Sequence, residues 1–324
     1  MRYDENDAES RNVEDRRGER SGMRLPGGGL QIPIGGGGFS FTSLLVIGAI
    51  MLFMGINPLE VLLGNGGGGQ VNLPQLPRSE RPSSPRNADD IPGLPGSRQA
   101  GGSSSQVPAA DDDMKVFTAR VLKDTEDVWH QVFKSFGQTY TDPQMVIYSG
   151  VTRTACGAGQ AAMGPFYCPL DQKVYIDLSF YEEMKRKFNA SGDFAHAYVV
   201  AHEIGHHVQN LLGIAEKVQD LRNRSDERES NQISVRMELQ ADCLAGVWAN
   251  LNDQMKNRLQ PGDVESALNA AAQIGDDMIQ KKISGRVVPD AFTHGTAAQR
   301  VRWFKTGIES GKMEACDTFN TSNP

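Results

Sequence analysis

The residues with the clearest chemical potential lie in one short run, where His202, Glu203 and His206 follow the pattern H-E-x-x-H. On an α-helix, residues four positions apart lie on one face, so two imidazoles can reach the same metal ion. The intervening glutamate then lies beside a water molecule on that ion. The pattern predicts one Zn²⁺ held by two histidines, with Glu203 taking a proton from a water whose pKa the ion lowers to about 7.

A catalytic zinc ion usually has three protein ligands and one position open to water. Glu238 and Asp242 are four residues apart in a segment whose apolar residues have helical spacing, so both can face the histidines. We expect Glu238 to be the third ligand and Asp242 to accept the Nδ1 proton of His202. The alternatives are Asp242 as the ligand and an acidic pair exposed to solvent.

The order of these motifs carries a family resemblance. H-E-x-x-H followed by E-x-x-A-D, from Glu238 to Asp242, resembles the gluzincin metallopeptidases, including membrane-bound heat-shock and CAAX-processing types. The stretch from about Val151 to Phe304 is similar to the bacterial family described as putative neutral zinc metallopeptidases. The motifs that carry this similarity are Thr152-Arg153-Thr154-Ala155-Cys156-Gly157, Gly164-Pro165-Phe166-Tyr167-Cys168-Pro169 and His294-Gly295-Thr296. The resemblance implies a zincin-like fold, hydrolysis of a peptide or protein substrate, an N-terminal anchor and a Gly/Pro-rich spacer.

The resemblance also gives roles to two residues near the C-terminus. In gluzincins a His or Tyr from a later segment stabilises the oxyanion, and His294 stands where it could do so. Arg300 is expected to brace the carboxylates. Thr296 is a candidate N-cap for the helix that carries Arg300. The alternative is a helix-capping loop whose histidine has no catalytic role.

The elements that must position these residues can be read from hydrophobic periodicity. We expect a mainly helical α+β domain over residues 114–324. Its predicted elements are helices over 113–136, Ser179–Phe188, 193–213 and about 233–248, a helix after Thr296, and strands at Met145–Tyr148 and Lys173–Leu178. Asp193 is the expected N-cap of the H-E-x-x-H helix. An exposed edge at the strand Lys173–Leu178 could bind an extended peptide.

The first third of the chain has a different composition. Residues 1–38 are rich in charges and glycine, and residues 64–113 are rich in Gly, Pro and Ser, so we expect a disordered N-terminus and a disordered linker. Between them, Phe39–Leu59 carries no charged side chain, and about 20 apolar residues span a bilayer. We therefore predict a single membrane-spanning anchor within residues 39–63. A cleaved signal peptide and a buried helix of a soluble domain are the alternatives.

Charge on either side of this anchor predicts its orientation. Arg11, Arg16, Arg17, Arg20 and Arg24 precede the apolar run, and the next arginine is Arg78. The positive-inside rule then places the N-terminus in the cytoplasm of a bacterium and the catalytic domain outside the inner membrane, in the periplasm or beyond.

Four cysteines are compatible with that location. We expect Cys156 to pair with Cys168 and Cys243 with Cys316, with free buried thiols as the alternative. His130, His196 and His207 are predicted to stay outside the metal site, the last two being hydrogen-bonded or facing solvent.

The sequence favours a membrane-anchored zinc endopeptidase, and it argues against nucleic acid as a partner. The net charge is −7, and no basic stripe accompanies a nucleic-acid fold. A second hypothesis is a non-catalytic, zinc-stabilised binding or assembly protein of the cell envelope. The glutamate of H-E-x-x-H argues against it, because a purely structural metal site needs no base.

Overall fold

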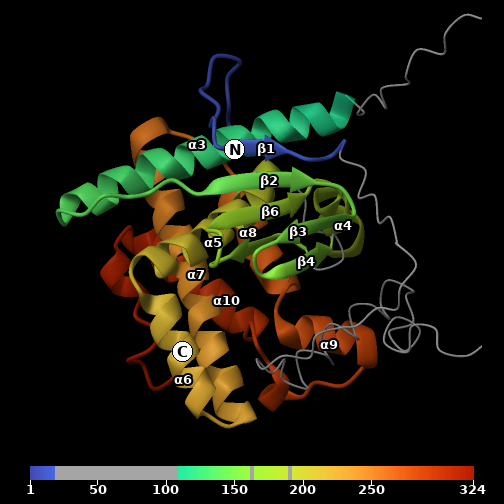
Figure 1. Cartoon of the computed structure of the whole chain (residues 1–324), viewed down its shortest axis with the longest axis vertical. Helices are drawn as coiled ribbons and strands as arrows, with labels where there is room; N and C mark the ends of the chain where they lie inside the picture. The colour runs from blue at the N-terminus through green and yellow to red at the C-terminus, as the bar shows by residue number, and fades with distance from the viewer. Residues whose placement is uncertain (19–108, 161–163, 189–191) are drawn as a thin grey trace, which may run out of the picture. The chain divides into compact units, whose positions relative to one another are not determined.

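The computed structural model describes residues 1–18, 109–160, 164–188 and 192–324. The predicted anchor over residues 39–63 lies outside these ranges, as do residues 19–38 and most of the predicted linker. No helix within the described ranges is long and apolar enough to span a bilayer. The described part is mainly helical with a small sheet, which confirms the expected α+β class (Figure 1).

The sheet holds β1 (Val13–Asp15), β2 (Gln144–Tyr148), β6 (Lys173–Asp177) and β5 (Phe166–Cys168), in that order. β1, β2 and β6 run parallel, and β5 is antiparallel to β6. The predicted strands β2 and β6 are present. The predicted exposed edge at β6 is wrong, because β2 and β5 flank this strand, and the outer strands of the four are β1 and β5.

The helices are α3 (Ala109–Ser135), α4 (Ser179–Phe188), α5 (Asp193–Leu211), α6 (Ile214–Arg224), α7 (Glu227–Lys256), α8 (Asp263–Gln273), α9 (Asp276–Ser284) and α10 (Ala297–Ser310). A hairpin of β3 (Val151–Thr154) and β4 (Gly157–Gln160) and the short 3₁₀ turns Pro289–Ala291 and Met313–Cys316 complete the described elements. Thr296 is the N-cap of α10 and forms a capping box with Gln299. At α5 the N-cap is Gly192, so Asp193 lies in the first turn instead.

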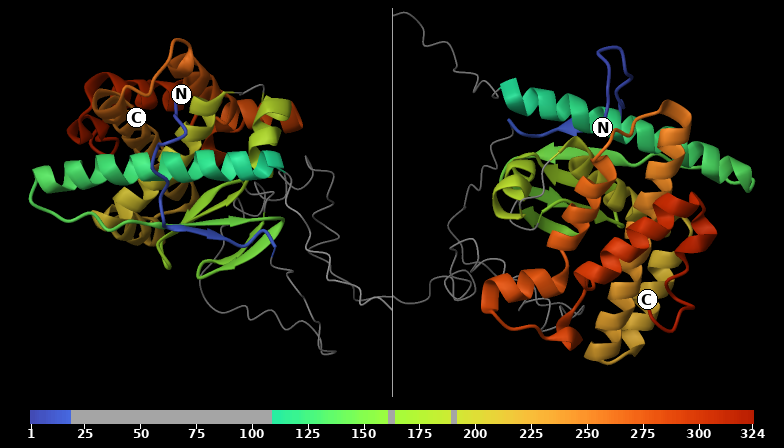
Figure 2. Two further views of the ribbon diagram at one scale, coloured as in Figure 1. Left: turned by 90° about the horizontal axis from the view of Figure 1, so that it is seen from above. Right: turned by 180° about the vertical axis from the view of Figure 1, so that it is seen from behind.

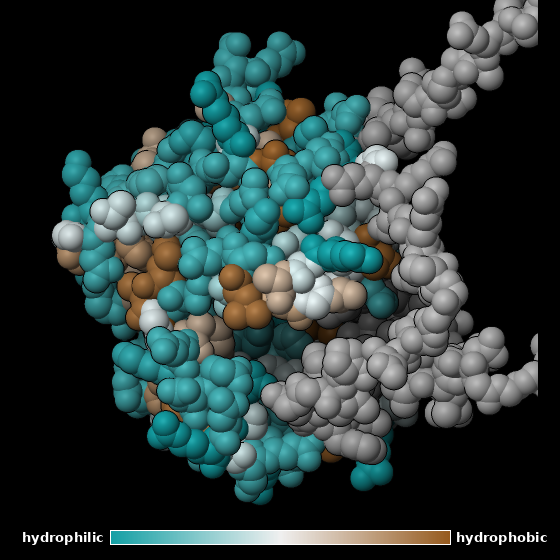
Figure 3. Space-filling view, in the orientation of Figure 1, coloured by the Kyte–Doolittle hydropathy of each residue, from teal (hydrophilic) through white to brown (hydrophobic). Residues whose placement is uncertain are grey.

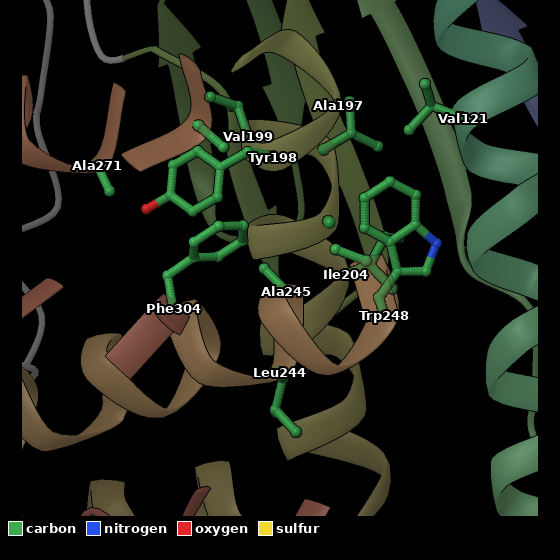
Figure 4. Close-up of a cluster of buried hydrophobic side chains, with 14 of the residues drawn as sticks. Val121, Ala197, Tyr198, Val199, Ile204, Leu244, Ala245, Trp248, Ala271 and Phe304 are labelled. Atoms are coloured by element: carbon green, nitrogen blue, oxygen red, sulfur yellow. The ribbon is translucent and has the colours of Figure 1, made fainter. Parts of the chain in front are cut away.

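Helices α5, α7 and α10 pack closely around a shared apolar core. Figure 4 shows the rings of Tyr198 and Phe304 next to each other in this core. The two rings meet edge to face, and their centroids are 5.1 Å apart. A methyl group at Gly205 would lie 3.0 Å from the Ala241 carbonyl oxygen, and one at Gly246 or Gly307 would clash with the backbone of the facing helix. Glycine is needed where α7 meets α10, and Gly205 lets α5 lie close against α7.

The N-terminal segment differs from our prediction. Residues 1–18 were expected to be disordered, but β1 pairs with β2, and Val13 packs against the core. Arg258, which is 7% exposed, donates to both oxygens of Asp7 at 2.6 and 2.8 Å and through Nε to Asp124 at 3.0 Å. The prediction is wrong here because long-range pairing satisfies the charged side chains, although the segment itself is polar.

Both expected disulfides are present. Cys156–Cys168 joins residues 12 apart and ties the β3–β4 hairpin to β5, whereas Cys243–Cys316 joins residues 73 apart and ties α7 to the C-terminal segment. Crosslinks that close longer loops remove more entropy from the unfolded chain.

Replacing Arg258 with methionine is expected to lower the free energy of unfolding by about 3 kcal/mol, because the buried Asp124 carboxylate loses a partner. Urea unfolding measures this, and limited proteolysis should show early cleavage within residues 1–18. The control Lys305→Met removes an exposed ion pair with Glu309 and should cost less than about 1 kcal/mol. Equal effects of the two changes would contradict the docking role of Arg258.

Removing Cys243–Cys316 by a double alanine replacement should destabilise the fold by about 4 kcal/mol, against about 3 kcal/mol for Cys156–Cys168. The difference follows from loop length and is measured by urea unfolding of the two variants. The reverse order would show that strain or residual structure outweighs chain entropy.

Candidate metal centre

Helix α5 presents His202 and His206 toward one carboxylate on α7. The Nε2 atom of His202 lies 3.1 Å from Oε2 of Glu238, and Nε2 of His206 lies 3.5 Å from its Oε1. The donor atoms of these three residues all lie within 4.8 Å of one another. The structure therefore brings together the three ligands expected from the sequence, with the Nε2 atom of each imidazole facing Glu238.

Asp242 is fully buried one turn beyond Glu238 and fixes the orientation of His202. It accepts a hydrogen bond from Nδ1 of His202 at 2.8 Å, and Arg300 donates to it through Nε at 2.8 Å and through Nη2 at 2.9 Å. Burial would raise the pKa of Asp242, but Arg300 and His202 lower it to about 2. The ionised carboxylate holds the Nδ1 proton, so Nε2 of His202 is left for a metal.

Tyr198 is a partner of this carboxylate that the sequence analysis missed. Its hydroxyl donates to Asp242 at 2.5 Å and accepts from Arg300 at 3.2 Å. It lies four residues before His202, one turn earlier on the same face of α5. That spacing could have identified Tyr198 as a residue of the site, but a tyrosine in an apolar helix is usually interpreted as a core residue.

Gln209 fixes the orientation of the His206 ring, as Asp242 fixes that of His202, and this role was not predicted from the sequence either. Its amide nitrogen donates to the Met237 carbonyl oxygen at 2.8 Å and to Gln240 at 3.0 Å. These two bonds fix the amide orientation, so its Oε1 faces Nδ1 of His206 at 2.8 Å as an acceptor. In the neutral imidazole this bond places the proton on Nδ1 and leaves Nε2 of His206 for a metal.

Glu203 is 8% exposed and lies next to His202 in the chain. Burial raises the pKa of its carboxyl, while the nearby His202 and His206 act in the opposite direction. Among the described residues its carboxylate has no hydrogen-bond partner. A carboxylate left without a structural partner can accept a proton from a water held beside it.

His294 lies in the loop before α10, which Asp276 holds in place. Asp276 accepts backbone N–H bonds from Thr293 and His294, each at 2.7 Å, and from Gly295 at 3.2 Å. Nδ1 of His294 is 3.3 Å from Asp276, and the side chain is 45% exposed. Although burial would raise the pKa of Glu238, the charges of His206 and then His294 help to lower it well below its usual range. Its role in oxyanion binding stays a prediction.

The other helix histidines lie outside the cluster. His207 is buried and satisfied: its Nδ1 is 2.9 Å from the Tyr167 hydroxyl, and its Nε2 is 2.7 Å from the Thr141 carbonyl oxygen. His196 packs on the Tyr181 ring, and neither of its nitrogens has a hydrogen-bond partner within the described residues. The expectation that His196 would be hydrogen-bonded or face solvent is therefore wrong, because aromatic packing encloses the ring.

The donor set fits zinc. Two imidazole nitrogens and one carboxylate are ligands that catalytic zinc sites use, and the Nδ1 atom of each histidine already has a partner. The same pattern leaves Glu203 out of the ligand set.

Replacing Gln209 with methionine should weaken zinc binding about 10- to 100-fold, because the acceptor that fixes the His206 ring is lost. Competition with a chelator of known affinity measures the change. Gln219→Met, which alters an exposed glutamine on α6, is the matched control and should leave zinc affinity unchanged. An unchanged affinity in the Gln209 variant would remove this residue from the site.

Comparisons with known proteins agree with this geometry. The family described as "Putative neutral zinc metallopeptidase" matches residues 1–319. "Uncharacterized protein YpfJ" of Escherichia coli K12 is 46% identical over 97% of each chain. "Uncharacterized protein Mb2605" of Mycobacterium bovis is 43% identical over 59% of this chain and 67% of its own length.

No solved structure matches the chain. The family match extends over nearly the whole sequence, and it includes the N-terminal segment as well as the metal cluster. The chain belongs to the family of putative neutral zinc metallopeptidases.

Proposed function

We propose that the protein is a zinc-dependent endopeptidase that hydrolyses peptide bonds with Glu203 as general base. The observation that carries this proposal is a buried glutamate, without a hydrogen-bond partner among the described residues, beside two histidines and a carboxylate that converge on one point. A structural zinc site is usually closed by four protein ligands. Here three donors converge, which suits a site that leaves one position to water.

In the proposed reaction, residues of three helices and of the loop before α10 have separate roles. Bound zinc would supply Lewis-acid polarisation and lower the pKa of water to about 7. Glu203 takes a proton from the attacking water and passes it to the leaving amine. Asp242, whose negative charge is balanced by Arg300, keeps His202 in the tautomer that a metal requires. His294 donates to the oxygen of the scissile carbonyl as negative charge develops there.

Strand β5 is the element best placed to bind substrate. It is one of the two outer strands of the described sheet, and Tyr167 in it contacts His207 and Asn210 of α5 through its hydroxyl, at 2.9 and 3.0 Å. These bonds hold the strand against the helix that carries the metal ligands. An extended peptide that pairs with β5 would be recognised through its main chain, which supports action on protein segments with little sequence preference.

Membrane attachment through Phe39–Leu59, a bacterial envelope location and a zincin-like fold are further parts of the proposal. They are supported by the uncharged apolar run, by the two disulfides and by the helix arrangement at the metal cluster. The alternative function is a zinc-stabilised binding or assembly protein without activity. The carboxylate of Glu203 favours the enzyme, because no other side chain in the described part of the protein engages it.

Replacing Glu203 with glutamine should reduce hydrolysis of an unfolded test protein at least about 100-fold while one zinc per chain is retained. Glutamine has nearly the same size but cannot accept the proton. Peptide release and metal content are measured on the same preparation, and chelation of the parent followed by zinc addition should abolish and restore activity.

His206→Ala on the same helix is the matched comparison and should lose zinc as well as activity. If the glutamine variant hydrolyses as fast as the parent, Glu203 is not the base. If the zinc-loaded parent hydrolyses nothing in an unbiased peptide library, the binding-protein alternative is favoured.

A further inference from the structure

The two ends of the stretch 19–108 meet at one place on the described structure. Arg17, just after β1, contacts Asp112 in the first turn of α3 at 3.1 Å, and Lys115 of α3 contacts Asp15 of β1 at 3.0 Å. Figures 1 and 2 show β1 running beside the first part of α3 in each view. The chain therefore leaves the folded unit and returns to it at neighbouring points.

The segment before this exit point is integrated into the fold. β1 is in register with β2, with Val13 opposite Met145 and Asp15 opposite Ile147. The buried Ser10 hydroxyl donates to Glu126 of α3 at 2.5 Å. A strand of a four-stranded sheet with buried polar bonds cannot be separated from that sheet by a bilayer, because its backbone groups would lose their partners.

The sequence of the intervening stretch restricts how it can meet a membrane. Phe39–Leu59 is the one run within residues 19–108 that has the length and apolar character to span a bilayer. One full crossing would place β1 and the rest of its sheet on opposite sides. Two crossings would need a second such run.

We propose that residues 1–18 and 109–324 occupy the same side of the membrane, and that Phe39–Leu59 attaches the folded unit to one face of a lipid bilayer without crossing it. This replaces the orientation expected from sequence, with the N-terminus inside and the catalytic domain outside. Two of the five arginines behind that expectation form ion pairs within the N-terminal segment: Arg16 with Glu14 at 2.6 Å and Arg17 with Asp15 at 2.7 Å.

The surface of the folded unit is consistent with attachment through this one run. On the face shown in Figure 3 the described residues are mostly hydrophilic, and their apolar areas are small and separate. The two disulfides, both within residues 109–324, favour an oxidising compartment for that part of the chain. The proposal does not depend on peptidase activity, so it can fail or succeed independently of the proposed function.

The test compares two variants of the full chain in its bacterial membrane, each with one cysteine added to the four that form disulfides. Asn6→Cys reports the N-terminal segment and Gln138→Cys reports the loop after α3, and both positions are exposed. A membrane-impermeant maleimide is applied to spheroplasts before and after permeabilisation, and labelled peptides are identified by mass spectrometry. Both sites should be labelled under the same condition. Labelling of one site in intact spheroplasts and of the other only after permeabilisation would overturn the proposal.

A second measurement tests the attachment itself. Purified full-length protein is floated with vesicles of phosphatidylethanolamine and phosphatidylglycerol, and the double variant Ile47→Asp/Leu52→Asp is the comparison. The parent should float with the vesicles, the variant should float at least 10-fold less, and the unfolding midpoints of the two should agree. A parent that stays with the soluble fraction, or a variant that floats equally well, would reject attachment through this run.

Discussion

The buried carboxylate of Asp242 is the interaction on which the rest of the site depends. It lies in the interior, where an uncompensated charge would be strongly unfavourable, and the guanidinium of Arg300 balances it. Because its partners come from α5 and α10 while it stands on α7 itself, one ionised group connects three helices. The orientation of His202 is therefore tied to the packing of the core, and the site cannot loosen independently of the fold.

The spacing between helices is the second constraint. Glu238 reaches both imidazoles only because α5 and α7 lie close together, and Gly205 between the two histidines faces the Ala241 backbone at this contact. Farther along α7, Gly246 meets Gly307 of α10, and the two glycines let these helices approach closely, which brings Arg300 within reach of Asp242. Small residues thus determine where charged ones can meet.

Local patterns predicted the parts of this protein that depend on local physics. The four-residue spacing of His202 and His206, the helical period around Glu238 and the capping residue Thr296 all describe neighbours on one helix, and the structure has them on helices as expected. These patterns were sufficient to expect that α5 and α7 would face each other.

Features that depend on long-range pairing were missed. β1 is polar and charged, so nothing local distinguishes it from a disordered tail, and its strand state comes from β2. β5 lies in a run rich in glycine, and its pairing with β6 and the Cys156–Cys168 bond define it. No local pattern distinguishes Gln209 from other helix residues, and its role depends on the bond from its amide to the Met237 carbonyl oxygen. For β1 and Gln209 the partner that decides the structure is far away in the chain, whereas β5 pairs with the nearby strand β6.

The parallel pairing of β1 with β2 has a consequence for how the chain is made. β1 leaves the ribosome before its partner β2, which emerges about 130 residues later, and Arg258, which holds Asp7 in place, emerges later still. Such distant pairings form slowly. During synthesis β1 therefore stays unpaired until β2 emerges, and both strands keep an open edge, which favours aggregation, until they meet.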